Sequence, residues 1–155
     1  MTTIESLLSI AAREIDTQEI PKGSNAGPKV DVYLRACGLN GGYPWCGAFV
    51  TWCFIQAGYI LDNPRRLAGA SNWFTAGRLV SRQQVRPGDV FGLYNLHLGR
   101  IAHVGIITEI IFIKGKPVSF RTIEGNTNDA GDREGYEVCA RLRPYSQPKV
   151  FARWT

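Results

Sequence analysis

The 155-residue sequence has no long apolar run and no visible targeting segment. No run approaches the roughly 20 residues needed to span a bilayer, so we expect no stable membrane insertion. The first residues, Met1–Glu5, lack a basic segment followed by an apolar core, so no classical signal peptide is expected. We therefore expect a protein made in the cytoplasm, which would need another route to act outside it.

Metal-binding patterns are also scarce. The chain has two histidines and four cysteines, and no two cysteines form a CxxC pair. Residues 126–137 have partial EF-hand spacing, but Asn126 stands where Asp is usual and Ala130 cannot ligate calcium. We expect no metal and no cofactor. The cysteines lack the density of a disulfide scaffold, and Cys37, Cys53 and Cys139 are interpreted as small buried side chains.

Positive charge exceeds negative charge without forming a patch. Eighteen Lys and Arg residues stand against 13 Asp and Glu residues, which gives a net charge of +5. This balance favours anionic partners such as a cell wall. The basic residues are scattered and no basic helix stands out, so we expect no nucleic-acid partner.

Apolar periodicity predicts helices in the first part of the chain. Thr2 and Glu5 match a capping box for a helix over about Ile4–Ile15. Two more helices are bounded by residues that start or stop helices: Pro28 to Gly38, and Cys46 to about Ala57 before Gly58. A short helical piece at about Asn72–Gly77 has Ser71 as its expected cap.

From Pro87 onward the pattern changes to the alternation that is typical of strands. Strands are predicted at Asp89–Leu93, Ile101–Ile107, Ile110–Lys114, Val118–Glu124, Tyr136–Arg143 and Val150–Trp154, with a hairpin turn at Gly115-Lys116. Helices followed by an antiparallel sheet predict an α+β fold, and the length suits a single domain over residues 1–155, expected to be a monomer.

Cys46 is the candidate nucleophile. It stands where the breaker-rich segment 40–44 passes into the apolar helix 46–57. The free N–H groups and the positive end of the helix macrodipole favour a thiolate over a thiol at that place.

His103 is the candidate general base and acid. Cysteine chemistry needs such a group to lower the thiol pKa and to protonate the leaving amine. His103 lies among β-branched residues of a predicted strand, where Gly105 leaves room beside its ring for another backbone or a substrate. On periodicity alone, a satisfied core histidine remains the alternative, and His97 is better explained as a turn residue.

Glu124 and Asn126 are the candidates for orienting the imidazole. They are two residues apart at the end of a predicted strand and so point the same way. Taken alone, they are better explained as ordinary surface residues. For substrate contact we consider Tyr43, Trp45 and Trp73, because aromatic side chains near the cysteine or in a connecting segment suit that role.

Together these motifs resemble the CHAP family, the cysteine- and histidine-dependent amidohydrolases and peptidases of the papain-like superfamily. The matching segments are Pro44–Val50, Pro87–Val90, Ile101–Ile107 and Ile123–Asn126, in the family's order. The resemblance implies a papain-like fold with Cys46 as nucleophile, His103 as general base and acid, and Glu124 as orienting carboxylate. Asn126 matches a position that assists in some members.

The resemblance also implies cleavage of an amide bond in peptidoglycan, by an N-acetylmuramoyl-L-alanine amidase or a peptide-bridge endopeptidase. Such enzymes include phage lysins released by a holin and exported bacterial toxins, for which an immunity protein would be a partner. Two alternatives remain open. One is an amidase acting on a protein or a glutathionylspermidine-type amide, and the other is a non-catalytic wall-binding module, which would have no need of the trio Cys46, His103 and Glu124.

Overall fold

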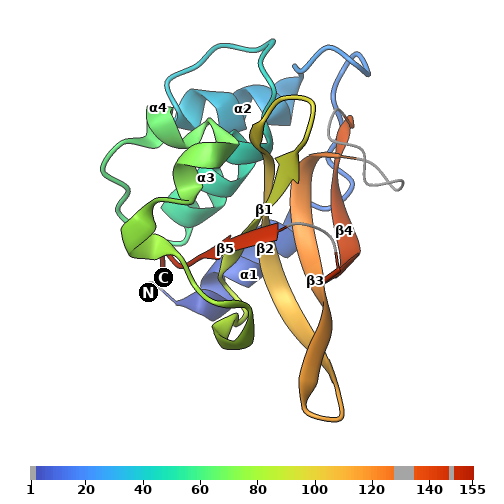
Figure 1. Ribbon diagram of the computed structural model, residues 1–155. Helices are drawn as coiled ribbons and strands as arrows, with labels where there is room; N and C mark the ends of the chain where they lie inside the picture. Colours follow the sequence, from blue (N-terminus) through green and yellow to red (C-terminus); the bar gives the residue numbers. More distant parts are fainter. Residues whose placement is uncertain (1–2, 128–134, 147–148) are drawn as a thin grey trace.

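The computed structural model describes residues 3–127, 135–146 and 149–155, with helices on one side and a β-sheet on the other (Figure 1). The helices are α1 (Ile4–Arg13), α2 (Pro28–Ala36), α3 (Cys46–Gln56) and the single turn α4 (Pro64–Leu67). Short 3₁₀ helices follow: η1 (Ala70–Trp73), η2 (Ala76–Arg78) and η3 (Arg82–Gln84). The strands are β1 (Val90–Asn95), β2 (Arg100–Ile113), β3 (Lys116–Thr127), β4 (Glu137–Pro144) and β5 (Lys149–Ala152). The predicted α+β class is confirmed.

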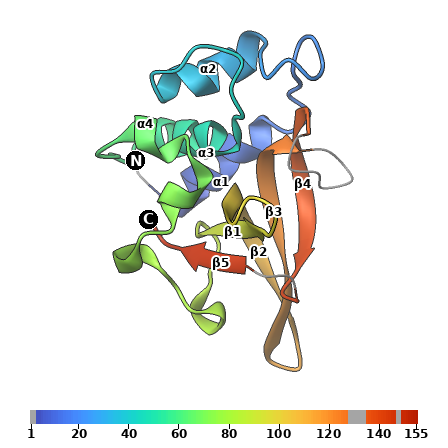
Figure 2. The same ribbon diagram turned by 45° about the horizontal axis from the view of Figure 1, so that its top comes forward.

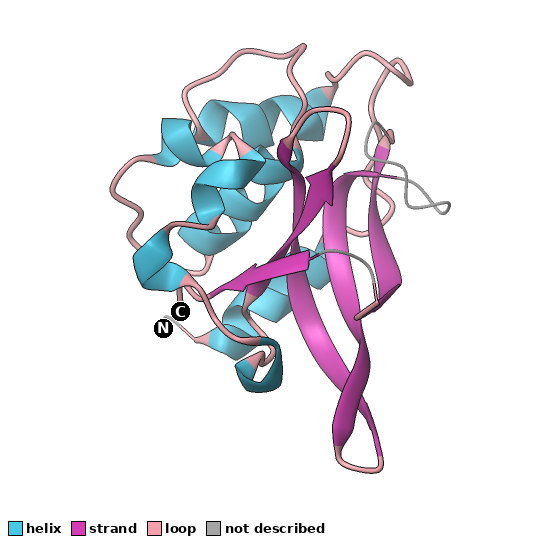
Figure 3. Cartoon of the chain, viewed as in Figure 1, coloured by secondary structure: helices cyan, strands magenta, loops and turns pink. Residues whose placement is uncertain are grey.

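The strands form one antiparallel sheet in the order β4-β3-β2-β1-β5. β5 therefore pairs with β1, at the edge opposite β4. Figure 3 shows that β2 and β3 extend as a long hairpin beyond the rest of the sheet. In Figure 2, α3 lies between α2 and the strands. None of the described helices is both long and apolar enough to cross a membrane.

The helix ends follow the local sequence closely. The side chain of Thr3 caps α1 by accepting a hydrogen bond from Ser6 N, so the predicted capping box, which begins at Thr2, is one residue too early. Pro28 occupies the first turn of α2, and α3 begins at Cys46, both as predicted. Gly58, just past α3, has a φ of 90°, a conformation in which glycine stops a helix without strain.

Several boundaries in the second half differ from the predictions. β2 is one continuous strand from Arg100 to Ile113, where two strands were predicted. The predicted break falls at a register shift between Ile107 and Glu109. The hairpin turn lies at Lys114-Gly115, one residue early, because both residues take positive φ. Ser71 is not a cap but lies inside η1, and α4 was not predicted.

Both faces of the sheet carry a buried apolar cluster. One face packs on the helices through Val104, Ile106 and Ile123, together with Phe49 and Phe54 of α3. The other carries a second apolar cluster that includes Phe91, Ile107, Phe120, Tyr145 and Phe151. α3 is apolar almost all round, and this central burial makes it a rigid support for the residue at its start.

Two glycines allow close approach around α3. A Cβ on Gly47 would lie 2.5 Å from Ala68 O, so the backbone after α4 sits directly on the first turn of α3. A Cβ on Gly125 of β3 would lie 2.7 Å from Phe49 Cβ and 2.8 Å from the Trp45 ring. These contacts fix the start of α3 against the end of β3.

Candidate active site

Cys46 is the first residue of α3 and is only 5% exposed. All four cysteines are buried thiols. Burial raises the pKa of the Cys37 and Cys53 thiols, whereas the pKa of Cys46 is lowered. Cys46 therefore differs from its neighbour on the same helix in the property that matters for a nucleophile, which is the stability of the thiolate.

His103 lies on β2, and its ring is 2% exposed. Its Nε2 lies 2.7 Å from Glu124 Oε1, which is hydrogen-bond distance. Its Nδ1 is buried and has no fully formed hydrogen bond within the described part of the chain. Because Nε2 is occupied by Glu124, Nδ1 is the nitrogen left to interact with Cys46, and the two side chains shift each other's pKa. A loose nucleophile–base contact of this kind is common when no substrate is bound.

Glu124 lies on β3 and is completely buried. Besides His103, its carboxylate accepts hydrogen bonds from Thr122 Oγ1 and from two nitrogens of Arg143, of which Nε lies 2.9 Å from Oε2. Gly105 makes room for this arrangement, because a Cβ there would lie 2.7 Å from Glu124 Cγ and 2.6 Å from the Phe91 ring. The space that the sequence predicted beside His103 is thus filled by protein side chains.

The charges of the site stabilise one another. Burial disfavours ionised Cys46, but hydrogen bonding and charge interaction with His103 lower the pKa of the thiol overall. Burial also disfavours protonated His103, yet Cys46 and Glu124 raise its pKa to about 9. Burial opposes ionised Glu124 as well, but His103 and Arg143 bring its pKa down to about 2. Each of the three shifts favours the charged form of its group, so the site stabilises the combination of thiolate, imidazolium and carboxylate.

A cleft of about 260 Å³ gives access to the Cys46 side of this array. Its lining is Leu39, Tyr43, Pro44, Cys46, Ala68, Gly69, Ala70, Arg100 and Ala102. Larger hollows lie along α1 and α3 and between α1 and the sheet, but Cys46, His103 and Glu124 line neither of them. We therefore assign the candidate active site to the smaller cleft, because Cys46 lines it. Within the described residues, no cluster of His, Cys, Asp and Glu could hold a metal ion.

A model of the CHAP domain family matches residues 38–126, more than half of the chain, including Cys46, His103 and Glu124. The chain belongs to the CHAP family. The resemblance drawn from its motifs is thereby confirmed. A search of curated proteins found no significant match. CHAP domains are usually hydrolases of the amidase or peptidase type, so this general class of activity applies to the chain.

Two of the three aromatic residues considered for substrate contact are core residues of this CHAP domain. Trp45 and Trp73 are both completely buried. The indole N–H of Trp45 donates to Glu19 Oε1 at 2.9 Å, and that of Trp73 donates to Leu67 O at 2.8 Å. Their assignment to substrate contact is corrected accordingly, whereas Tyr43 is half exposed and lines the cleft.

Asn126 ends up beside the site in an unusual conformation. It has a φ of 55° and is buried, at a register shift between β3 and β4. Its side-chain oxygen has no hydrogen-bond partner among the described residues. Its assisting role stays a prediction. Most of the EF-hand-like segment that starts at Asn126 lies outside the described residues.

Sequence reasoning missed Arg143, which contacts the proposed orienting carboxylate, and Glu19, which holds Trp45 next to Cys46. In β4 the exposed residues are Ala140, Leu142 and Pro144, while Arg143 between the last two is buried. Strand alternation alone puts Arg143 on the same face as Cys139, and that was the available signal. It was not used because a basic residue is ordinarily assigned to the solvent side of a strand.

Proposed function

We propose that the protein hydrolyses an amide bond in peptidoglycan through a thioester on Cys46. Cys46 acts as nucleophile, His103 as general base and acid, and Glu124 as the carboxylate that orients His103. Both an N-acetylmuramoyl-L-alanine amidase and a peptide-bridge endopeptidase use this chemistry, and the proposal includes either bond.

The reaction takes place in two steps on this array. The Cys46 thiolate attacks the amide carbonyl carbon and forms a tetrahedral oxyanion, and the C–N bond then breaks as protonated His103 gives its proton to the leaving amine. Neutral His103 next takes a proton from water, which attacks the thioester and releases the carboxylic acid and Cys46. The backbone N–H of Cys46, at the helix start, and a group from the loop around Tyr43 are the proposed donors to the oxyanion.

The observation that carries the proposal is the buried sequence of contacts from Cys46 through His103 to Glu124, open to a cleft at the cysteine end. Burying three ionisable groups side by side is costly unless they stabilise one another, and binding alone gives no reason for that cost. This favours catalysis over a non-catalytic wall-binding module.

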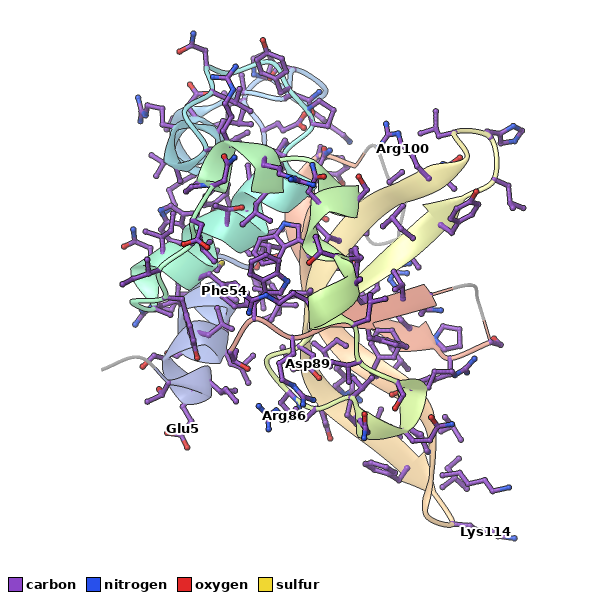
Figure 4. The ribbon with its side chains drawn as sticks, turned by 60° about the vertical axis from the view of Figure 1, so that its left-hand side comes forward. Glu5, Phe54, Arg86, Asp89, Arg100 and Lys114 are labelled. Atoms are coloured by element: carbon purple, nitrogen blue, oxygen red, sulfur yellow. The ribbon has the colours of Figure 1, made fainter. Side chains whose placement is uncertain are left out.

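Arg100 supports a substrate that carries negative charge near the scissile bond. It is the one basic side chain among the described residues that line the cleft. It is exposed at one end of β2, and Lys114 lies in the hairpin turn just past the other end (Figure 4). Peptidoglycan stem peptides carry free carboxylates beside their amide bonds, and an arginine at the cleft suits such a group.

The proposal places the enzyme at the cell wall and treats it as a monomer made in the cytoplasm. Two settings fit, a phage lysin released through a holin and a bacterial toxin exported by a dedicated system and neutralised by an immunity protein. The positive net charge suits an anionic wall in either setting.

The test is a comparison of substrates. Purified peptidoglycan, a glutathionylspermidine-type amide and a casein digest are each incubated with the wild type, with Cys46→Ala as the blank, and the products are identified by mass spectrometry. We expect new amine or peptide termini from peptidoglycan alone, and the fragment masses locate the cleaved bond.

Two results would redirect the proposal. Cleavage of one of the other amides, with peptidoglycan intact, would keep the chemistry and replace the substrate. Co-sedimentation of both proteins with peptidoglycan, without any released product, would favour the wall-binding module.

A further inference from the structure

Arg143 lies on β4, outside the residues matched by the family model, and its side chain is 8% exposed. We propose that Arg143 is a positioning residue of the active site, which fixes the carboxylate of Glu124 toward His103 and completes an electrically neutral buried array with Cys46. The catalytic meaning of this role rests on the function proposed above, but the role itself can be tested without any substrate.

The geometry around Glu124 leaves the carboxylate no freedom to turn. Oε1 forms hydrogen bonds with His103 Nε2, at 2.7 Å, and with the terminal Nη2 of Arg143. Oε2 accepts hydrogen bonds from Arg143 Nε, at 2.9 Å, and from the hydroxyl of Thr122. Arg143 thus grips both oxygens with its planar fork, a two-point contact that a lysine cannot make. The oxygen that holds the imidazole is held in turn by the guanidinium.

The charges give a second reason for an arginine here. In the reactive state Cys46 and Glu124 each carry a negative charge, and His103 carries one positive charge. Without Arg143 this buried group would have a net charge of −1, which is costly away from water. With Arg143 the sum is zero, so ionisation of Cys46 no longer leaves an uncompensated buried charge.

Arg143 lies among aromatic and basic side chains of neighbouring strands. Its guanidinium lies 5.7 Å from the centre of the Phe91 ring, which also packs edge-on against His103 at 6.2 Å. Lys149 of β5 interacts electrostatically with Arg143, Arg82 and Glu124. Its pKa is lowered to about 8, first by burial and then by the positive charges of Arg143 and Arg82. Arg82 donates through Nη2 to Tyr145 O at 2.8 Å.

Replacement of Arg143 should change the pKa and the reactivity of the Cys46 thiol. Loss of a nearby positive charge makes it harder to ionise the thiol, so the pKa of Cys46 should rise in Arg143→Gln. If the pKa of Cys46 rises by about one unit, the fraction of thiolate at pH values below that pKa falls about tenfold, and the alkylation rate falls with it. Arg143→Lys retains the charge and should lose less reactivity, but it cannot hold both oxygens of Glu124.

The experiment uses two measurements on the folded, substrate-free protein. The rate of alkylation of Cys46 by iodoacetamide is followed by peptide mass mapping from pH 4 to 10, and the ring N–H proton of His103 is followed by NMR. The chain has only one other histidine, His97 in the exposed β1–β2 loop, which serves as an internal reference. Arg121→Gln is the matched control, because Arg121 is exposed and pairs with exposed Glu109.

We expect Arg143→Gln to alkylate about tenfold more slowly at pH values below the pKa of Cys46 and to lose the hydrogen-bonded His103 proton signal, while Arg121→Gln matches the wild type. In Arg143→Lys the His103 signal should move. An unchanged alkylation profile and His103 signal in folded Arg143→Gln would overturn the inference. If that variant does not fold, an unchanged His103 signal in Arg143→Lys would overturn it. A wild type that shows the lowered thiol pKa but releases nothing from peptidoglycan would count against the proposed function alone.

Discussion

Gly125 of β3 touches Phe49 of α3 so closely that a Cβ on Gly125 would come within 2.7 Å of Phe49 Cβ. This contact joins the two halves of the site, because Gly125 directly follows Glu124 and Phe49 lies one turn after Cys46. The distance between nucleophile and carboxylate therefore depends on a glycine that takes no part in the chemistry.

Gly125→Ala should destabilise the protein by about 1–3 kcal/mol, because the new methyl group forces α3 and β3 apart in a packed core. The hydrolysis rate should fall as well, since Cys46 moves relative to His103. Gly77→Ala is the control, because its Cβ would meet no atom within 4 Å. Urea unfolding and hydrolysis rates measure both effects, and equal stability of the two variants would contradict the packing argument.

The pH dependence of kcat/KM should be bell-shaped. The reactive state needs Cys46 ionised and His103 protonated. Activity therefore rises with pH through the lowered pKa of Cys46, and it is lost as pH rises through the raised pKa of His103, about 9. A rate that keeps rising beyond pH 10 would show that protonated His103 is not required.

Arg143 and Glu124 should be coupled in stability. Each single change, Arg143→Gln or Glu124→Gln, leaves one buried charge without its partner and should cost about 3–5 kcal/mol. The double variant removes both charges, so it should cost clearly less than the sum of the two single changes. Denaturant unfolding of the four proteins measures this coupling, and additive costs would mean that the two side chains act independently.

Arg100→Gln should raise KM about three- to fivefold for substrates with a carboxylate beside the scissile amide, with little change in kcat, because a partly screened ion pair contributes little. The effect should vanish for a substrate whose carboxylate is amidated. Lys114→Gln, in the hairpin turn just past the opposite end of β2 (Figure 4), is the matched control. The same loss for both kinds of substrate would remove the reason to assign an anion to this cleft.

The sequence was sufficient to predict the fold class and the three residues that meet in the site. Cys46 could be found because a loop of glycines and a proline before an apolar run marks a helix start, which is a local signal. His103 stood out as a polar residue on an otherwise apolar strand, whereas Glu124 became a candidate only in combination with Cys46 and His103. The helices were placed to within a few residues for the same reason.

The remaining features depend on contacts between distant segments. Arg143 reaches Glu124 only because β4 pairs with β3 in one particular register, which periodicity does not fix. Trp45 was considered for substrate contact because it neighbours Cys46, but its ring turns into the core toward Glu19. β5 pairs with β1 from the far end of the chain, a choice that its four residues do not encode by themselves.

The central claim is that Cys46 is the nucleophile, and the most direct test is the initial rate at which new termini appear in purified peptidoglycan. Cys46→Ala is compared with Cys53→Ala, a change of another buried cysteine on the same helix. We expect Cys46→Ala to lose activity by a factor of about 10⁴ or more, as loss of a catalytic nucleophile does, while Cys53→Ala stays near the wild-type rate. Wild-type release of termini by folded Cys46→Ala would contradict the account.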